Sequence, residues 1–445
     1  MNRETATPHV ETIPGPRARE RVAHHSSFAA PSTYVYEFVW DVTAPATGPF
    51  CTDADGNVLL DFTSHVGAAP LGYNNPTLLE RMDAFDIVDP LKIAGQDFYT
   101  TAGDPRSQAF PGPTELMERL AETASHYGID TVFLSNSGAE AVENGIKICY
   151  DHTGGTYGIT FEGAFHGRTL GALSLNRSKE VHRRHFPGLP SIHDAPFCRD
   201  GDCDPTTCEC GFFAGDTSTL RRMLDPERGH VNADEVAYLI IEPVQGEGGY
   251  HVPSDAFMTE IASLCSEHDI PLVADEIQSG MGRTGEFWAT DHFPIEPDVI
   301  CAAKGARVGA TLAAEDVFPS ETARISSTWG AGDLIDSLQG ALTIDVIYEE
   351  QLLANATTRG RQARDELGDA DLPNVVDVRG KGLMLGIEFD TKTRRDDVLD
   401  AAFERGLLTL GCGYKTLRLL PPLDVRQREI SMAVDLLEEA TQAAA

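Results

Sequence analysis

The stretch that most constrains the fold is residues 271–304, which reads PLVADEIQSGMGRTGEFWATDHFPIEPDVICAAK. It contains two short apolar runs, Pro271–Ala274 and Val299–Ala303, which are typical of buried parallel strands. Each run ends at one ionisable residue, Asp275 after the first and Lys304 after the second. Because ligands of open α/β sheets bind at the carboxyl ends of the strands, the pattern predicts an acid and an amine at one ligand-binding edge.

An acid and a lysine held away from water at one edge indicate a site for pyridoxal phosphate (PLP). Lys304 lies between alanine and glycine, and such a lysine can hold the cofactor's aldehyde as a Schiff base. Asp275 would keep the ring nitrogen protonated, so that the ring accepts electrons from a substrate carbanion. Gln278 would hydrogen-bond the ring's 3-oxygen. The alternative is a βαβ unit with an aspartate helix cap and a lysine of no special role.

A candidate phosphate site lies upstream. The segment TVFLSNSGAEAVENGIKICY predicts a strand, a turn at Ser137-Gly138 and a helix from about Ala139. Turn amides and a helix N-terminus bind anions, so the phosphate would rest on the backbone of Gly138 and Ala139 with help from Ser137. The alternative is that these residues form an ordinary capped helix start without a ligand.

A strand and loop follow in YGITFEGAFHGRTLGALSL. Phe165 could stack on the pyridine ring, and Arg168 could bind a substrate carboxylate with its planar guanidinium. The alternative places Phe165 in the core and pairs Arg168 with a surface acid. His166 is expected to hydrogen-bond within the loop rather than to act as a catalyst.

The charge balance excludes some partners and suggests an environment. The formal net charge is −34 and the isoelectric point near 4.6, which makes nucleic acid and anionic membranes improbable partners. The sequence shows no apolar run of about 18 residues and no signal-peptide core. We therefore expect a cytoplasmic protein without membrane contact, and the abundant acids suggest a halophile.

Four of the nine cysteines form a cluster in FCRDGDCDPTTCECGFF, with the spacing C-x4-C-x4-C-x-C. Four thiolates in so short a loop could close a structural zinc site, although the spacing differs from paired C-x2-C knuckles. Free thiols or a disulfide are the alternatives. In either case we expect the cluster to stabilise an inserted loop at 198–210 rather than to take part in the reaction. Its members are Cys198, Cys203, Cys208 and Cys210.

The domain organisation is expected to be that of an α/β protein with a second, smaller domain. Residues 1–28 have no periodicity and would form an arm that is disordered or contacts the other subunit of a dimer. Residues 29–75 form an N-terminal segment packing with the small domain. Residues 76–335 form the large PLP-binding domain, and residues 336–445 the small C-terminal domain.

The segments SNSGAEAVENGIK, GAFHGRT, IIEPVQGEGGY, LVADEIQSGMGRTGEFWA, AAKG and LRLLPPL occur in this order. Together they resemble the class III (ω-) aminotransferases of PLP fold type I, over roughly residues 35–435. The resemblance implies an aspartate-aminotransferase-like fold. Its large domain would surround a mostly parallel central sheet, and its smaller C-terminal domain would be α+β.

The resemblance also implies roles for single residues. It supports the cofactor roles of Lys304, Asp275, Gln278 and Phe165, and it makes Gly138 and Ala139 the phosphate binders. Thr328 would join them from the second subunit of a homodimer, whose sites are shared across the interface.

The substrate-binding residues come from the same resemblance. Arg168 would bind the distal carboxylate of an ω-amino acid, and Arg418 the α-carboxylate of glutamate. Glu247 would pair with Arg418 and release it when the dicarboxylic substrate arrives, so that one pocket serves both an amino donor and a 2-oxo acid acceptor.

The implied activity is transfer of the amino group of 4-aminobutyrate to 2-oxoglutarate, which yields a semialdehyde and glutamate. Val66 falls where 4-aminobutyrate enzymes carry an aliphatic residue and ornithine enzymes a tyrosine. The segments KGARVGAT and SSTWGAGD look instead like the L-lysine 6-aminotransferases. L-lysine 6-transamination and ornithine 5-transamination are therefore alternatives, and a PLP-dependent amino-acid racemase is a further one.

Overall fold

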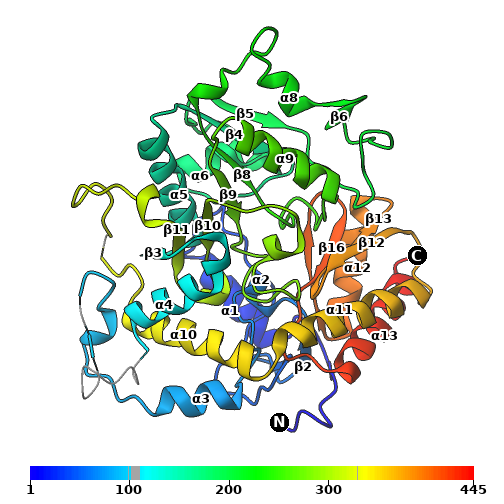
Figure 1. The fold of residues 1–445 in the computed structure, drawn as a ribbon. Coiled ribbons are helices and arrows are strands. Elements are labelled where there is room, and N and C mark those ends of the chain that lie inside the picture. Colours follow the sequence, from blue (N-terminus) through cyan, green and yellow to red (C-terminus); the bar gives the residue numbers. More distant parts are fainter. Residues whose placement is uncertain (99, 102–110, 328) are drawn as a thin grey trace. The chain divides into compact units, whose positions relative to one another are not determined.

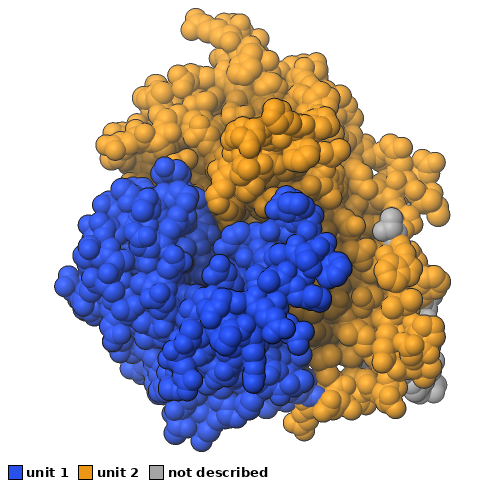
Figure 2. All heavy atoms as spheres, turned by 180° about the vertical axis from the view of Figure 1, so that it is seen from behind, with its two compact units in different colours: residues 1–79, 355–445 blue, residues 80–354 orange. Residues whose placement is uncertain are grey.

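The computed structural model describes residues 1–98, 100–101, 111–327 and 329–445 (Figure 1). The chain divides into two compact units, which Figure 2 colours separately. Unit 1 comprises Met1–Leu79 and Asn355–Ala445, and unit 2 comprises Glu80–Ala354. Within the described part of the chain, no helix is both long and apolar enough to cross a membrane.

Unit 2 is built on a seven-stranded sheet with the order β3-β11-β10-β9-β8-β4-β5. β11 runs antiparallel to its neighbours β10 and β3, and the other neighbours pair in parallel. The sheet is therefore mostly parallel, as the sequence predicts. Its strands are β3 (Thr131–Ser135), β4 (Tyr157–Phe161), β5 (Ile192–Ala195), β8 (Val236–Ile241), β9 (Leu272–Asp275), β10 (Val299–Ala302) and β11 (Gly309–Ala313).

Both faces of this sheet are buried. Every residue of β8 is buried, because neighbouring side chains of a strand point to opposite faces and both faces carry a hydrophobic cluster. Leu239 shares a cluster with Ile261 of α9 (Asp255–Glu267), whereas Ile240 shares another with Ile146 of α5 (Gly138–Thr153). The apolar run of β8 thus places helices on both sides of the sheet (Figure 1).

The remaining helices of unit 2 surround this core. Helix α10 (Leu334–Glu349) belongs to unit 2 because it packs against α4 (Pro113–Ala124) and the 3-10 helix η5 (Lys304–Ala306). The predicted domain boundary after residue 335 instead places most of this helix in the C-terminal domain. A small hairpin of β6 (Phe213–Ala214) and β7 (Thr217–Ser218) precedes α8. The other helices are α4 (Pro113–Ala124), α6 (Leu170–Leu175), α7 (Glu180–Arg183), α8 (Thr219–Met223) and α10 (Leu334–Glu349), and α3 (Pro76–Asp83) contains the division between the units.

The pairing of β9 with β10 confirms the two parallel strands predicted at Pro271–Ala274 and Val299–Ala303. The two strands are parallel, with Cys301 opposite Asp275. Asp275 is the last residue of β9, and Lys304 begins η5 just after β10. Because parallel neighbours end on the same side of a sheet, the acid and the lysine emerge at one edge.

Unit 1 contains two smaller sheets, β1-β2-β14 and the antiparallel β12-β13-β16-β15. The second sheet, with helices α11, α12 and α13, makes up the smaller C-terminal part. The strands are β1 (Phe50–Thr52), β2 (Val58–Asp61), β12 (Val375–Lys381), β13 (Met384–Phe389), β14 (Leu407–Leu408), β15 (Leu410–Cys412) and β16 (Thr416–Leu419). The helices are α1 (Pro16–Ser26), α2 (Ser64–Gly67), α11 (Leu352–Asp369), which starts just before the boundary, α12 (Lys392–Glu404) and α13 (Gln427–Ala443).

The first 28 residues, for which the sequence predicts a disordered or dimer-contacting arm, contain helix α1. Its start is held by a distant turn, because the carboxylate of Asp55 accepts a hydrogen bond from the N–H of Ala18 at 2.8 Å. Further upstream, Arg3 Nε lies 2.7 Å from a carboxylate oxygen of Glu429. Partners so far along the chain leave no local periodicity in the sequence.

Candidate active site

Asp275 and His166 form a buried pair at the edge of the sheet. Asp275 is 4% exposed and His166 is 1% exposed. Nδ1 of His166 lies 2.7 Å from Oδ2 of Asp275, and the N–H of Ile277 donates to Oδ1 of Asp275 at 3.1 Å. The backbone N–H of His166 in turn donates to Asn176 at 2.6 Å. Since buried carboxylates need such partners, this network fixes the orientation of Asp275.

Lys304 lies at the same edge on a constrained turn. Its φ of 48° falls in the left-handed region, which is uncommon for residues other than glycine. Such a conformation costs about 1–3 kcal/mol and persists only where the surrounding structure holds it. Its neighbours Ala303, Gly305 and Ala306 are buried, and Lys304 itself is half-buried. The amine is therefore carried by a backbone that packing fixes in place.

The start of helix α5 contributes an anion-binding geometry. Ser137 is the N-cap residue, and its hydroxyl accepts a hydrogen bond from the N–H of Glu140 at 3.2 Å. Gly138 packs so closely that an added Cβ would lie 2.9 Å from Cδ1 of Ile277. The helix start therefore lies against the segment that follows Asp275. The first N–H groups of a helix have no acceptor within it, and with the helix dipole they attract anions.

The loop after β4 packs on the same helix start. A Cβ added to Gly167 would lie 2.7 Å from Cβ of Ala139. In this loop the guanidinium carbon of Arg168 lies 5.5 Å from the centroid of the Phe165 ring, a cation–π distance. Phe165 is half-buried and Arg168 is exposed. No acidic side chain among the described residues forms a salt bridge with Arg168, so the surface ion pair considered from sequence is not formed.

Glu242 is a buried acid to which the sequence assigned no role. It follows β8, and its Oε1 and Oε2 accept hydrogen bonds from the N–H groups of Phe165 and Gly246, both at 2.9 Å. Burial raises the pKa of Glu242 to about 7, the charge of Asp275 adds to this, and His166 and the two N–H groups oppose it. One carboxyl group thus links the loops that follow β4 and β8.

The loop after β8 also positions two predicted residues. A Cβ added to Gly246 would lie 2.5 Å from Oε1 of Gln278, so the carboxamide of Gln278 lies directly against this loop. Oε1 of Glu247 lies 2.5 Å from Nζ of Lys179. Lys179 is therefore a charged neighbour of the site that the sequence did not single out.

The other predicted residues lie elsewhere in the chain. Arg418 and Val66 belong to unit 1. Arg418 is on β16 and 7% exposed, and Val66 is in α2 with φ of 62°. Thr328 lies outside the described residues. The roles of these three residues stay predictions.

The residues at the edge of the unit 2 sheet fit the groups of PLP. A buried, oriented carboxylate suits the ring nitrogen, a helix start suits the phosphate, and a lysine on a fixed turn suits the aldehyde. The close approaches at Gly138 and Gly167 keep the backbone near the helix start free of side chains. These residues are therefore chemically compatible with this cofactor.

Comparisons with known proteins point in the same direction. The model of the family described as Aminotransferase class-III matches residues 37–441. An acetylornithine aminotransferase from Methanopyrus kandleri is 33% identical over 404 residues, covering 90% of this chain and 94% of that protein. A 4-aminobutyrate aminotransferase from Mycobacterium leprae is 32% identical, with 96% of each covered. The lysine aminotransferase from M. tuberculosis, solved in the internal aldimine form, superposes with a TM-score of 0.82 at 29% identity, covering 96% and 99%.

Proposed function

The chain belongs to the class-III aminotransferase family, a PLP-dependent family of fold type I, and on that premise we propose that it transfers the amino group of 4-aminobutyrate to 2-oxoglutarate. The products would be a semialdehyde and glutamate. The observation that carries the substrate class is Arg168, an exposed guanidinium that rests on the Phe165 ring. A planar guanidinium beside the cofactor site suits the far carboxylate of an ω-amino acid.

The residues of the sheet edge have distinct tasks in this proposal. When bound, PLP supplies an electron sink for the carbon that loses a proton. Asp275 holds a proton at the ring nitrogen, and His166 keeps the Asp275 carboxylate oriented. Nζ of Lys304 takes the proton from the amine-bearing carbon of the donor, as a general base positioned by its turn. The helix start at Gly138 and Ala139 anchors the phosphate, and Phe165 packs against the ring.

The charged residues around the donor pocket would select among substrates. Arg168 attracts a carboxylate, whereas the ion pair of Glu247 with Lys179 adds little net charge. We assign the distal carboxylate of the donor to Arg168. The sequence-based assignment of the acceptor's α-carboxylate to Arg418, with Glu247 as its gate, is part of the same proposal.

A homodimer is also part of the proposal. Unit 2 exposes several large apolar side chains, among them Val88 (67% exposed), Leu91 (54%), Phe98 (68%) and Trp329 (77%). These four line an open cavity of about 1,100 Å³. Apolar surface on this scale commonly marks a protein interface. A second copy of the chain is the partner that the family resemblance implies, and we expect sites shared across that interface.

The donor can be identified by half-reactions on the purified holoenzyme. We would add 4-aminobutyrate, L-lysine, L-ornithine or N-acetyl-L-ornithine separately, without acceptor, and follow the visible absorbance of the bound cofactor. N-acetyl-L-ornithine is included because relatives such as the M. kandleri protein carry the name acetylornithine aminotransferase. The proposal expects 4-aminobutyrate to bleach the absorbance fastest and 2-oxoglutarate to restore it.

The other outcomes separate the alternatives. If L-lysine, L-ornithine or N-acetyl-L-ornithine bleaches the absorbance faster, that compound is the donor instead of 4-aminobutyrate. The reaction would still be a transamination. An α-amino acid that changes chirality while the absorbance is retained, with no response to any ω-amine, would reject transamination in favour of racemisation.

A further inference from the structure

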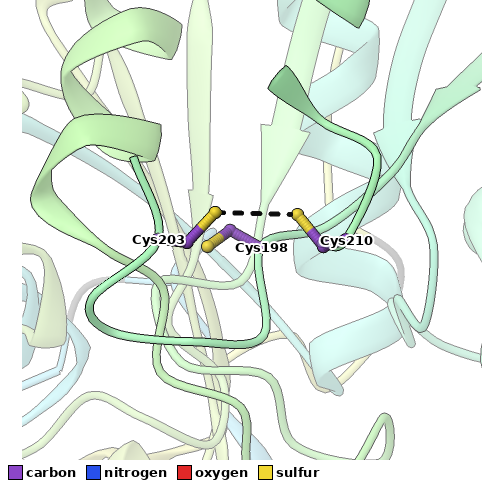
Figure 3. Close-up of side chains that lie close together, drawn as sticks. All are labelled: Cys198, Cys203 and Cys210. Carbon is purple, nitrogen blue, oxygen red and sulfur yellow. Dashed lines mark hydrogen bonds between the residues drawn. The ribbon is translucent and has the colours of Figure 1, made fainter. Parts of the chain in front are cut away.

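Four cysteines lie in the loop between β5 and β6, and the sulfurs of three of them lie close to one another. Sγ of Cys210 lies 4.0 Å from Sγ of Cys203 and 3.4 Å from Sγ of Cys208. The sulfurs of Cys198, Cys203 and Cys210 all lie within 4.8 Å of one another, and Figure 3 shows these three side chains close together in the loop. These four residues are called the cysteine cluster below.

The loop that carries the cluster buries thiols in an otherwise polar segment. Residues 196–212, all of them described, contain neither helix nor strand. Yet Cys198 is fully buried and Cys203 is 3% exposed. The N–H of Cys203 donates to the carbonyl of Asp200 at 3.1 Å, which turns the chain back toward Cys198. Since loops normally lie on the surface with few buried groups, this inward arrangement needs a cause.

A backbone N–H group points at one of the sulfurs. The N–H of Phe213 donates to Sγ of Cys208 at 3.3 Å. Such a donor favours the thiolate over the thiol, and the thiolate is the form that binds a metal. Hydrogen bonds to ligand sulfurs are also a common outer layer of metal centres.

The sulfur spacing fits a tetrahedral metal centre. Sulfurs about 2.3 Å from zinc in a tetrahedron lie about 3.8 Å apart. The separations of 3.4 Å and 4.0 Å lie on either side of that value. Cys198, Cys203 and Cys210 already lie within 4.8 Å of one another, whereas Cys208 does not lie within that distance of all three, so its side chain must turn to reach the same ion. We propose that the cysteine cluster binds one Zn²⁺ ion through four thiolates.

Paired disulfides explain the arrangement less well. The sulfur of Cys210 neighbours both Cys203 and Cys208, so the cluster has one centre rather than two pairs. The structure contains no disulfide between any of these four residues. A set of soft sulfur ligands also selects zinc over hard cations such as magnesium or calcium.

The ion would have a structural role. Four protein ligands leave no open position for a substrate, as in other structural zinc sites. The site would tie the chain just after β5 to the chain just before β6. It would also hold two flanking aromatic residues in the core, because the rings of Phe197 and Phe212 lie 5.2 Å and 4.4 Å from that of Phe257.

The first test is a metal analysis of the full-length holoenzyme. Protein purified under reducing conditions is desalted against a weak chelator, and its zinc content is measured by mass spectrometry. We expect about one zinc ion per chain. Replacement by Co²⁺ should give intense thiolate-to-cobalt charge transfer with the visible bands of a tetrahedral site. This measurement on the wild-type chain does not depend on any variant folding.

Matched substitutions locate the site. Cys203→Ser and Cys208→Ser should each weaken zinc binding by at least about tenfold in a competition with a chromophoric chelator. Cys265→Ser is the control, because Cys265 is a buried thiol of the same hydrophobic cluster but lies on α9, outside the cysteine cluster. It should retain zinc as the wild type does.

Several results would overturn the proposal. One is a wild-type chain that holds no zinc after purification and takes up none from an equimolar zinc solution under reductant. Another is equal zinc content in Cys203→Ser, Cys265→Ser and the wild type, which would indicate adventitious binding to the acidic surface. A third is a cobalt spectrum without thiolate charge transfer.

Discussion

Nδ1 of His166 lies 2.7 Å from Oδ2 of Asp275, and both side chains are buried where β9 ends. The imidazole therefore acts on the cofactor site through the carboxylate, which makes His166 a positioning residue. Its own backbone N–H donates to Asn176 at 2.6 Å, which fixes the loop backbone that carries the ring. This chain of contacts defines the orientation in which Asp275 meets a bound ring.

Replacing His166 should slow the reaction without removing the cofactor. A hydrogen bond to a charged group contributes about 1.5–3 kcal/mol, which corresponds to a loss of about 10- to 100-fold in kcat for His166→Phe. His166→Gln, which keeps a donor, should recover part of the rate. Steady-state kinetics with the visible spectrum of the bound cofactor measure both effects. His230→Phe, at an exposed position, serves as control, and a normal kcat in His166→Phe would contradict the positioning role.

Lys304→Ala should abolish transamination while PLP still binds noncovalently. General acid–base catalysis contributes about 10²–10⁴-fold, so we expect a loss of at least about 10³-fold in kcat. Lys147→Ala on the exposed side of α5 is the matched control and should leave the rate unchanged. Single-turnover absorbance changes after donor addition provide the measurement. Full activity in Lys304→Ala would remove the lysine from the mechanism.

Arg168 should act on donor affinity. Loss of a charge-assisted hydrogen-bonding pair costs about 1.5–3 kcal/mol, so Arg168→Ala should raise the donor KM about 10- to 100-fold with a small change in kcat. Arg168→Lys keeps the charge but not the planar guanidinium, so its donor KM should lie between those of the wild type and Arg168→Ala. Arg184→Ala, at an exposed i,i+4 pair with Glu180, controls for loss of surface charge. An unchanged donor KM would place Arg168 outside the pocket.

Much of the fold of unit 2 was predictable because its central strands are short apolar runs that the sheet buries. β9 and β10 were predicted within one residue at each end. β11 was not predicted, because GATLA has small residues and little β-branched character. Glycine is needed at position 309 because a Cβ there would lie 2.3 Å from Oγ of Ser135, a contact that the sequence alone does not show.

The candidate site was predictable where each residue follows its own strand or begins its own helix. Asp275 and Lys304 are of this kind. The pairing of His166 with Asp275 joins residues 109 positions apart, and the hydrogen bonds that Glu242 accepts from Phe165 and Gly246 depend on how two loops meet. Local patterns carry no information on such distances, although the strand-terminal position of Glu242 was a signal that could have marked it.

The homodimer proposal predicts that a charge in the exposed apolar patch splits the assembly. Trp329 is 77% exposed and lines the cavity with Val88 and Leu91. Trp329→Asp should shift the mass measured by light scattering from dimer to monomer and lower activity in parallel. Tyr414→Asp, at a side chain 74% exposed in unit 1, is the control for adding the same charge elsewhere. A wild-type monomer with full activity would reject the proposal.

Glu242 should make stability depend on pH with a defined sign. Its folded-state pKa is raised from 4.5 to about 7, mainly by burial, so the folded protein binds its proton more tightly than the unfolded chain does. The stabilisation from this group is fully present below pH 4.5 and is lost as the pH rises through 7, by about 3 kcal/mol in all. Glu242→Gln removes this titration.

Denaturant unfolding at pH 5, 6, 7 and 8 should therefore show the wild type losing stability relative to Glu242→Gln as the pH rises. The comparison between the two proteins cancels the titration of the other groups. Glu162→Gln, at an exposed acid 4.0 Å from Arg199, should instead track the wild type across the range. A constant difference between wild type and Glu242→Gln at all four pH values would mean that Glu242 does not take up a proton on folding.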